Sequence, residues 1–161
     1  MIILIKENHG NCLSVIENIE ATRSLLKAST CIIGVEGYDY TPPATISERS
    51  RIRENPAFAK KLNSEYGNIV FGVDSRSLCD EIECDLYDKK YKEAAAHPNQ
   101  HKRSAVFLEN LLSLLKTKPN SQIGVVCAGA RHVDDITTIL NGDARYQGCG
   151  FVVFESTSYT A

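Results

Sequence analysis

The sequence of 161 residues has no apolar run near the length of a membrane-spanning helix, which takes about 20 residues. Its net charge is only −2, so no strong electrostatic field argues for binding to nucleic acid or to an acidic membrane. The first apolar stretch, residues 2–5, lacks a basic leader and runs straight into Lys6, unlike a secretory signal peptide. We therefore expect a cytoplasmic protein that acts on a small-molecule or peptide substrate. The sequence leaves the oligomeric state open.

Several common catalytic and cofactor motifs are missing from the sequence. It contains no HExxH metal helix, no phosphate-binding P-loop, no GxGxxG turn and no GxSxG nucleophile turn. The chain has six cysteines, but the only close pair is Cys79 and Cys84. That spacing is neither the CxxC of a redox site nor half of a zinc site. We expect free thiols in a reducing compartment.

Four short apolar runs are present, and each ends in polar side chains of the types used in catalysis. The runs are rich in β-branched residues and apolar on both faces, which is typical of buried parallel strands. The carboxyl ends of parallel strands lie along one edge of a sheet, where open α/β folds bind ligands. We therefore expect the polar residues after the runs to converge. The runs and their polar followers are 2–5 with Glu7 and His9, 31–35 with Glu36, 69–73 with Asp74, and 123–127 with Arg131 and His132.

Helical patterns separate the apolar runs, and a fifth strand is expected over residues 150–154. We predict a single α/β domain over residues 1–161, built on a mainly parallel five-stranded sheet flanked by helices. Within residues 40–65, the weakly amphipathic helical pattern of 46–65 predicts a small helical insertion or a lid. The other helices are expected over residues 13–26, 76–96, 100–116 and 133–140.

The two histidines at the ends of the runs are the first candidates for catalysis. His9 precedes Gly10, and a neutral imidazole there can act as a general base or bind a metal; a solvated or capping histidine is the alternative. His132 follows small residues that open a helix, where backbone N–H groups such as that of Gly129 can face an oxyanion. Arg131 beside it could bind a substrate carboxylate or phosphate, or could be a plain surface arginine.

The acidic candidates are Glu36 and Asp74. A carboxylate after a fully apolar strand is costly unless it is paired, metal-bound or protonated; for Glu36 an ion pair with Arg103 is the competing interpretation. Asp74 could help to bind substrate or could cap the next helix. Together, His9, Glu36 and His132 could hold one divalent ion such as zinc, manganese or cobalt. The same groups could also activate water with no cofactor at all.

Five segments carry a combined pattern in a fixed order along the chain. They are residues 5–10 (IKENHG), 35–37 (VEG), 72–74 (GVD), the helical stretch 103–112 and 128–132 (AGARH). This combination resembles the motifs of the erythromycin-esterase-like and ChaN-like proteins, a group that also includes TraB and the Tiki proteases. Two features depart from that group: Lys6 stands where glycine is usual, and the chain is shorter than a typical member.

The resemblance implies a hydrolase-like site of His9, Glu36, Arg103 and His132, with Glu7 and Asp74 beside it. Members of the group hydrolyse esters, cleave proteins with a metal or handle haem and iron, so the substrate does not carry over. In the hydrolase hypothesis His9 is the base, helped by Glu7 or Glu36. Arg103 and the 129–132 turn then stabilise an oxyanion, and His132 is a second acid/base or a metal ligand.

Two other hypotheses stay open. The chain could be a non-catalytic module that keeps the fold and binds a small ligand, a metal or a protein, which Lys6 and the short length favour. It could also be a plain α/β domain whose strand-end polar groups are caps and ion pairs.

Overall fold

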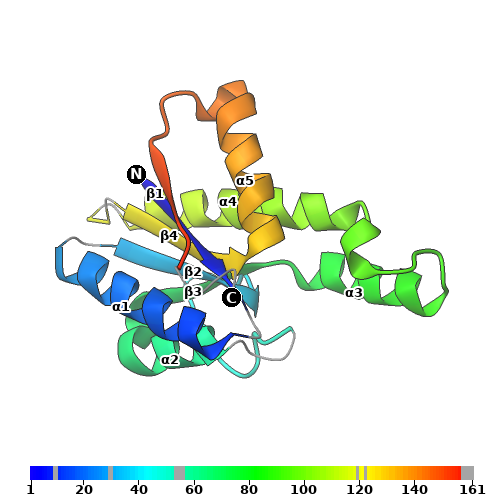
Figure 1. Ribbon diagram of the computed structural model, residues 1–161, viewed down its shortest axis with the longest axis horizontal. Helices are drawn as coiled ribbons and strands as arrows, with labels where there is room; N and C mark the ends of the chain where they lie inside the picture. The colour runs from blue at the N-terminus through cyan, green and yellow to red at the C-terminus, as the bar shows by residue number, and fades with distance from the viewer. Residues whose placement is uncertain (9–10, 29–30, 53–56, 119, 122, 157–161) are drawn as a thin grey trace.

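Five parallel strands form one sheet in the order β3-β2-β4-β1-β5 (Figure 1). The computed structural model describes all residues except 9–10, 29–30, 53–56, 119, 122 and 157–161. The expected parallel five-stranded α/β architecture is thereby confirmed. The strands are β1 (Ile2–Glu7), β2 (Cys31–Asp39), β3 (Val70–Asp74), β4 (Ile123–Gly129) and β5 (Phe151–Phe154).

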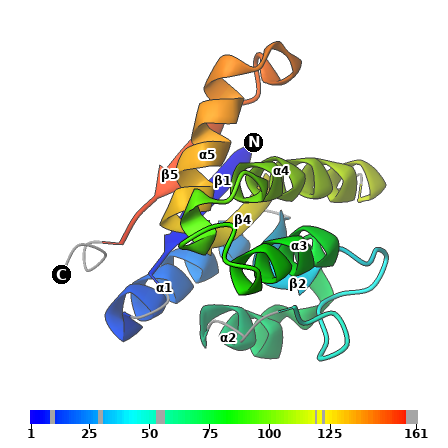
Figure 2. The same cartoon turned by 90° about the vertical axis from the view of Figure 1, so that its right-hand side faces the viewer.

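Helices cover both faces of this sheet (Figures 1 and 2). Alternate residues of β1 enter different cores: Ile2 and Leu4 pack with α4 and α5, whereas Ile3 and Ile5 pack on the side of α1 and α2. This two-sided burial explains why β1 to β4 contain continuous apolar runs, whereas Val152 and Val153 of the edge strand β5 are exposed. None of the helices in the described part of the chain is long and apolar enough to cross a membrane. The helices are α1 (Cys12–Ala28), α2 (Ala57–Tyr66), α3 (Arg76–Tyr87), α4 (Asn99–Thr117) and α5 (Ala130–Gly142), with short 3₁₀ turns η1 (Gly67–Ile69), η2 (Ala94–Ala96) and η3 (Ala144–Tyr146).

The described part of residues 40–65 lies mostly on the surface and is anchored to the domain by a few buried side chains. Residues 46–52 do not form the predicted helix, and α2 covers Ala57–Tyr66. Ile46, Ala59 and Leu62 are buried in the same core as the strands. The Ile46 N–H donates to the Val70 carbonyl at 3.1 Å, so this segment is fixed along the edge strand β3.

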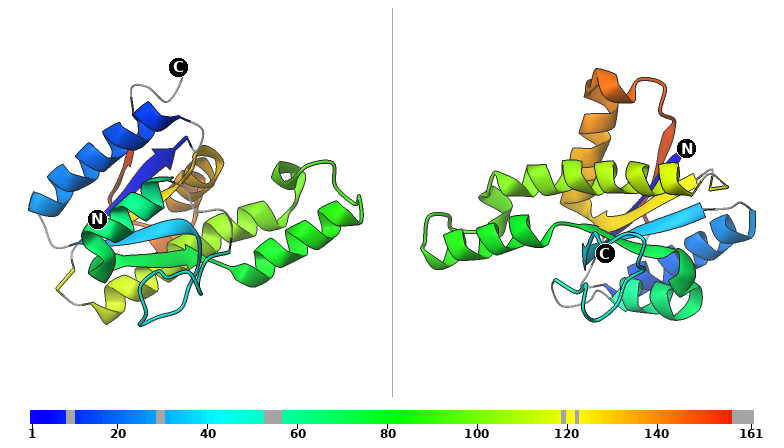
Figure 3. Two further views of the ribbon diagram at one scale, coloured as in Figure 1. Left: turned by 90° about the horizontal axis from the view of Figure 1, so that it is seen from below. Right: turned by 180° about the vertical axis from the view of Figure 1, so that it is seen from behind.

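The helical stretch predicted over residues 76–96 ends earlier than expected. Helix α3 stops at Tyr87, and the chain turns through Lys89, which has a positive φ of 56°. Helix α3 and the first turns of α4 then extend beyond the sheet as a hairpin (Figure 3). His97 joins the two helices, because its Nδ1 accepts from the Asn99 N–H at 3.1 Å and its Nε2 lies 3.0 Å from an Asp85 oxygen.

The pairing of β2 with β3 changes register next to Glu36, between Val35 and Asp39. Gly37 lies between these two residues and has a φ of 81°. A side chain at Gly72 on β3 would meet the carbonyl oxygens of Asp39 and Tyr38 at 2.3 and 2.5 Å. The end of β2 therefore bends closely over a glycine of β3, and this bend places Glu36 at the carboxyl edge of the sheet.

Candidate functional site

The carboxyl edge of the sheet brings together Glu36 from β2, Asp74 from β3, Arg103 from α4 and His132 from α5. These four side chains are linked by ion-pair distances, with Arg103 and His132 each reaching Glu36. Parallel strand direction explains why residues spread along the chain meet here. His9 lies outside the described residues, and its place in the site stays a prediction.

Arg103 and Asp74 form the fully buried centre of this cluster. Arg103 donates from Nε to Asp74 Oδ1 at 3.0 Å and from Nη2 to Oδ2 at 2.6 Å, with neither side chain exposed. Asp74 also accepts the N–H groups of Gly37 and Ser75, and Gln100 accepts from Arg103 Nη1. Burial is the largest single influence and lowers the pKa of Arg103, but the hydrogen bonds that Asp74 accepts, together with the nearby negative charges of Asp74 and Glu36, raise it overall. Arg103 is thus held away from solvent.

Glu36 sits at the amino end of helix α5. Its Oε2 accepts the N–H of Gly129 at 2.8 Å, a favourable position for a negative charge because of the helix dipole. Its Oε1 lies 3.5 Å from Arg103 Nη2 and 3.5 Å from His132 Nε2. The backbone donor that the sequence suggested for a substrate oxyanion is therefore occupied by the protein's own carboxylate.

His132 is a buried imidazole with both ring nitrogens facing polar groups. Its Nδ1 lies 2.8 Å from the Ser104 hydroxyl, and its ring packs against Phe107 with 4.8 Å between ring centroids. Burial is the main cause that lowers the pKa of His132, and it outweighs the attraction of Glu36 for a proton. The ring is therefore neutral at neutral pH, which is the form that can accept a proton.

The remaining candidates lie around this cluster. Glu7 is only 3% exposed at the end of β1, opposite Gly129 in the sheet register. Arg131 is exposed on α5. Lys6, the residue that departs from the family pattern, pairs with Asp134 at 2.9 Å and with Glu155 at 3.3 Å. Its ammonium therefore ties β1 to α5 and to the chain after β5.

The described residues alone do not form a metal centre. Among them, no group of three His, Cys, Asp or Glu side chains could hold a metal ion. Glu36 and His132 supply two of the three predicted ligands, but the guanidinium of Arg103 lies 3.5 Å from the Glu36 oxygen. Its positive charge opposes a cation at that oxygen. A metal at this edge would also depend on His9, which lies outside the described residues.

Two polar residues beside His132 were not found from the sequence. Ser104 follows Arg103 on α4, and Asp135 lies three residues after His132 on α5. Their hydroxyl and carboxylate are 2.8 Å apart. The i, i+3 spacing of His132 and Asp135 places them on one helix face, and that spacing was the available signal.

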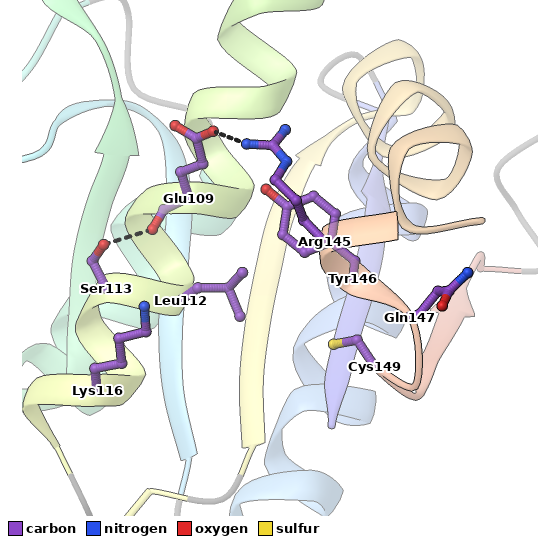
Figure 4. Close-up of a pocket in the computed structure, with 8 residues that line it drawn as sticks. All are labelled: Glu109, Leu112, Ser113, Lys116, Arg145, Tyr146, Gln147 and Cys149. Atoms are coloured by element: carbon purple, nitrogen blue, oxygen red, sulfur yellow. Dashed lines mark hydrogen bonds and ion pairs between the residues drawn. The ribbon is translucent and has the colours of Figure 1, made fainter. Parts of the chain in front are cut away.

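A cleft of about 590 Å³ lies on the α4 side of the molecule, away from the strand-end site (Figure 4). It is bounded by the second half of α4 and by the chain from η3 to β5. Its cations are Lys116 and Arg145, and Arg145 pairs with Glu109 at 3.6 Å across the opening. Leu112 and Tyr146 supply apolar surface. Because Cys149 in its wall precedes β5, the cleft faces the amino ends of the strands.

Comparison with known proteins gives no match among family models, curated proteins or solved structures. The fold and the site define an α/β protein in which a buried histidine, arginine and aspartate and a partly buried glutamate cluster at the carboxyl edge of the sheet. What the chain does is therefore inferred from the chemistry of that cluster.

Proposed function

We propose that the chain is a small hydrolase of the erythromycin-esterase, ChaN and TraB type that its motifs resemble. The observation that carries the proposal is a histidine kept neutral by burial, with Nε2 3.5 Å from Oε1 of Glu36 at the ligand-binding edge of the sheet. A neutral imidazole beside a carboxylate is a suitable general base for activating water.

One water molecule can donate to both atoms at once. A water oxygen can lie about 2.8 Å from both Nε2 and Oε1, because these two acceptors are only 3.5 Å apart. As the water oxygen attacks an ester or amide carbonyl, its proton moves to His132 Nε2. The imidazolium is stabilised by Glu36 and returns the proton to the leaving group as the scissile bond breaks.

Arg103 acts in this scheme as a positioning residue. Its guanidinium donates hydrogen bonds to Asp74 and Gln100, and its Nη2 lies 3.5 Å from Oε1 of Glu36. It stabilises the ionised form of that carboxylate. The two histidine roles expected from the sequence are thereby exchanged: His132, whose contacts are described, is the base, and His9 is the candidate for the second acid or base. The proposed mechanism needs no metal.

A turnover assay on aryl esters of increasing acyl length and on peptides tests this proposal. We expect His132→Gln to lower kcat/KM by about 100-fold or more, since a general base contributes about that much, and Glu36→Gln to lower it less. Thr138→Ala, on the same helix as His132, is the matched control and should match the wild type. Activity should survive a chelator. A folded wild-type protein that turns over none of these substrates, or a fully active His132→Gln, would overturn the hydrolase.

The alternative is a non-catalytic binding module, and the cleft beside α4 is the observation that favours it. The ammonium of Lys116 beside the apolar surface of Leu112 and Tyr146 suits a small amphipathic anion, whereas Arg145 is already paired with Glu109 and Asp143. Anilinonaphthalene sulfonate is such a probe, and its fluorescence reports entry into an apolar site. Saturable binding that Lys116→Ala weakens, in a protein without turnover, would favour the module over the hydrolase.

A further inference from the structure

The two nitrogens of His132 face different partners. Nε2 faces Glu36 in the proposed catalytic site at 3.5 Å, which is longer than a hydrogen bond. Nδ1 faces the Ser104 hydroxyl at 2.8 Å, and that hydroxyl lies 2.8 Å from Oδ2 of Asp135. Asp135 reaches the surface, where its other oxygen lies 3.5 Å from Nδ1 of the exposed His101.

The single hydroxyl hydrogen of Ser104 determines which groups donate and which accept in the hydrogen bonds that link His132, Ser104 and Asp135. The hydroxyl has one hydrogen and three neighbours: Asp135 Oδ2, His132 Nδ1 and the Gln100 carbonyl at 3.1 Å. A carboxylate and a carbonyl can only accept. If Nδ1 were also an acceptor, at least one of the 2.8 Å contacts would hold two acceptors with no hydrogen between them. Both become hydrogen bonds when Nδ1–H donates to Ser104 and Ser104 donates to Asp135.

We infer that Asp135 and Ser104 form a positioning relay that holds His132 in its Nδ1–H tautomer. Nε2 then keeps its lone pair on the side of Glu36, where the proposed base must act. The packing of the ring against Phe107 supports the same orientation. The tautomer itself is independent of any activity, and only its catalytic consequence rests on the proposed hydrolase.

Substitution of either Asp135 or Ser104 should change the tautomer of His132, but for a different reason in each variant. Asp135→Asn supplies an N–H that can donate to Ser104, so the chain can reverse, with Ser104 donating to Nδ1. Ser104→Ala removes the described partner of Nδ1, and among the described residues Glu36 is then the carboxylate that lies within 4 Å of a ring nitrogen. In both variants we expect His132 to change to the Nε2–H tautomer, with its hydrogen directed at Glu36.

The experiment is a long-range ¹H–¹⁵N correlation spectrum of the full chain with labelled histidine, at about pH 8 where a histidine is neutral. His132→Gln identifies the His132 signals. Asp134→Asn and Ser113→Ala are matched controls, because Asp134 is the neighbouring exposed acid and the Ser113 hydroxyl bonds only its own helix carbonyl at 2.8 Å. We expect Nδ1–H in the wild type and in both controls, and Nε2–H in Asp135→Asn and Ser104→Ala.

A wild-type spectrum of the Nε2–H form, or variants that keep the wild-type tautomer, would overturn the relay. If Ser104→Ala does not fold, Asp135→Asn on the half-exposed carboxylate still decides the outcome. In the hydrolysis assay Asp135→Asn should lower kcat about tenfold or more with KM unchanged, as for a group that acts only through the base. The expected tautomers without turnover would uphold the relay and defeat the hydrolase. Turnover by the wild type, with the same His132 tautomer in every variant, would support the hydrolase and overturn the relay.

Discussion

The guanidinium of Arg103 and the carboxylate of Asp74 share two hydrogen bonds, at 3.0 and 2.6 Å, in a place where neither side chain meets solvent. Asp74 also accepts the N–H of Gly37 at 3.1 Å. The pair therefore joins helix α4, the end of β3 and the bent end of β2. Glu36 is held at the site through this junction.

Removing one partner of that pair should be strongly destabilising. Asp74→Ala leaves the Arg103 charge buried without its counter-ion, and we expect the free energy of unfolding in urea to fall by about 3–5 kcal/mol. The double variant Asp74→Leu/Arg103→Met, which buries no charge, should be more stable than Asp74→Ala alone. Asp143→Asn, at the exposed pair with Arg145, is the control and should have a much smaller effect. Equal losses for the buried and exposed pairs would contradict this account.

The free energy of unfolding should decrease as the pH falls through the range in which histidine side chains are protonated. Burial lowers the pKa of His132 below its ordinary 6.5, so on acidification the unfolded chain takes up its proton before the folded one. Protonation of His132 in the unfolded chain therefore lowers the free energy of unfolding from about pH 7.5 downward. The decrease ends when the pH has fallen below the pKa of His132 in the folded protein. Urea unfolding at several pH values should show a smaller slope in His132→Gln. A wild type that gains stability on acidification relative to this variant would mean that the folded ring is charged.

The cysteines should react with a thiol reagent according to their burial. Cys31 and Cys127 are buried, and burial raises the pKa of Cys31 to about 11 and that of Cys127 well above its ordinary value. Because the thiolate is the reactive form, both should resist iodoacetamide in the folded protein. Exposed Cys84 should react first and half-buried Cys149 more slowly, as followed by peptide mass spectrometry. Denaturation should abolish the difference, and rapid labelling of Cys127 in the native protein would contradict the buried placement.

Gly72 should tolerate no side chain. A Cβ there would lie 2.3 Å from the Asp39 carbonyl oxygen and 2.5 Å from that of Tyr38, and backbone atoms cannot move aside cheaply. We expect Gly72→Ala to cost about 1–3 kcal/mol or more of unfolding free energy. Gly142→Ala is the control, since a Cβ at Gly142 meets nothing within 4 Å. Similar melting temperatures for the two variants would contradict the close approach of β2 to β3.

The strand-end part of the site could be predicted because it depends on strand direction alone. Once the apolar runs were read as parallel strands, Glu36, Asp74 and His132 had to lie along one edge. The partner of Arg103 was less predictable: the sequence suggested Glu36, whereas the close bidentate partner is Asp74. That choice depends on how α4 lies across the sheet, which no local pattern encodes.

The parts that sequence reasoning missed depend on packing between helices. Ser104 and Asp135 are ordinary polar residues of two helices, and only the rotation of α4 against α5 brings them together behind His132. Residues 46–65 have a weak helical pattern, but Ile46 and Leu62 are buried. A few apolar side chains are enough to anchor that surface segment to the core, which average amphipathicity does not reveal.

The place of β1 between β4 and β5 has a consequence for how the protein is made. Strand β1 pairs with residues 124–129 and 151–154, which are synthesised more than a hundred residues after it. Until then both edges of a highly apolar strand stay bare, whereas β2 and β3 can pair much earlier. Such long-range pairing slows folding and exposes the nascent chain to aggregation. Completion of the sheet therefore has to wait until residues 124–129 and 151–154 are available to pair with β1.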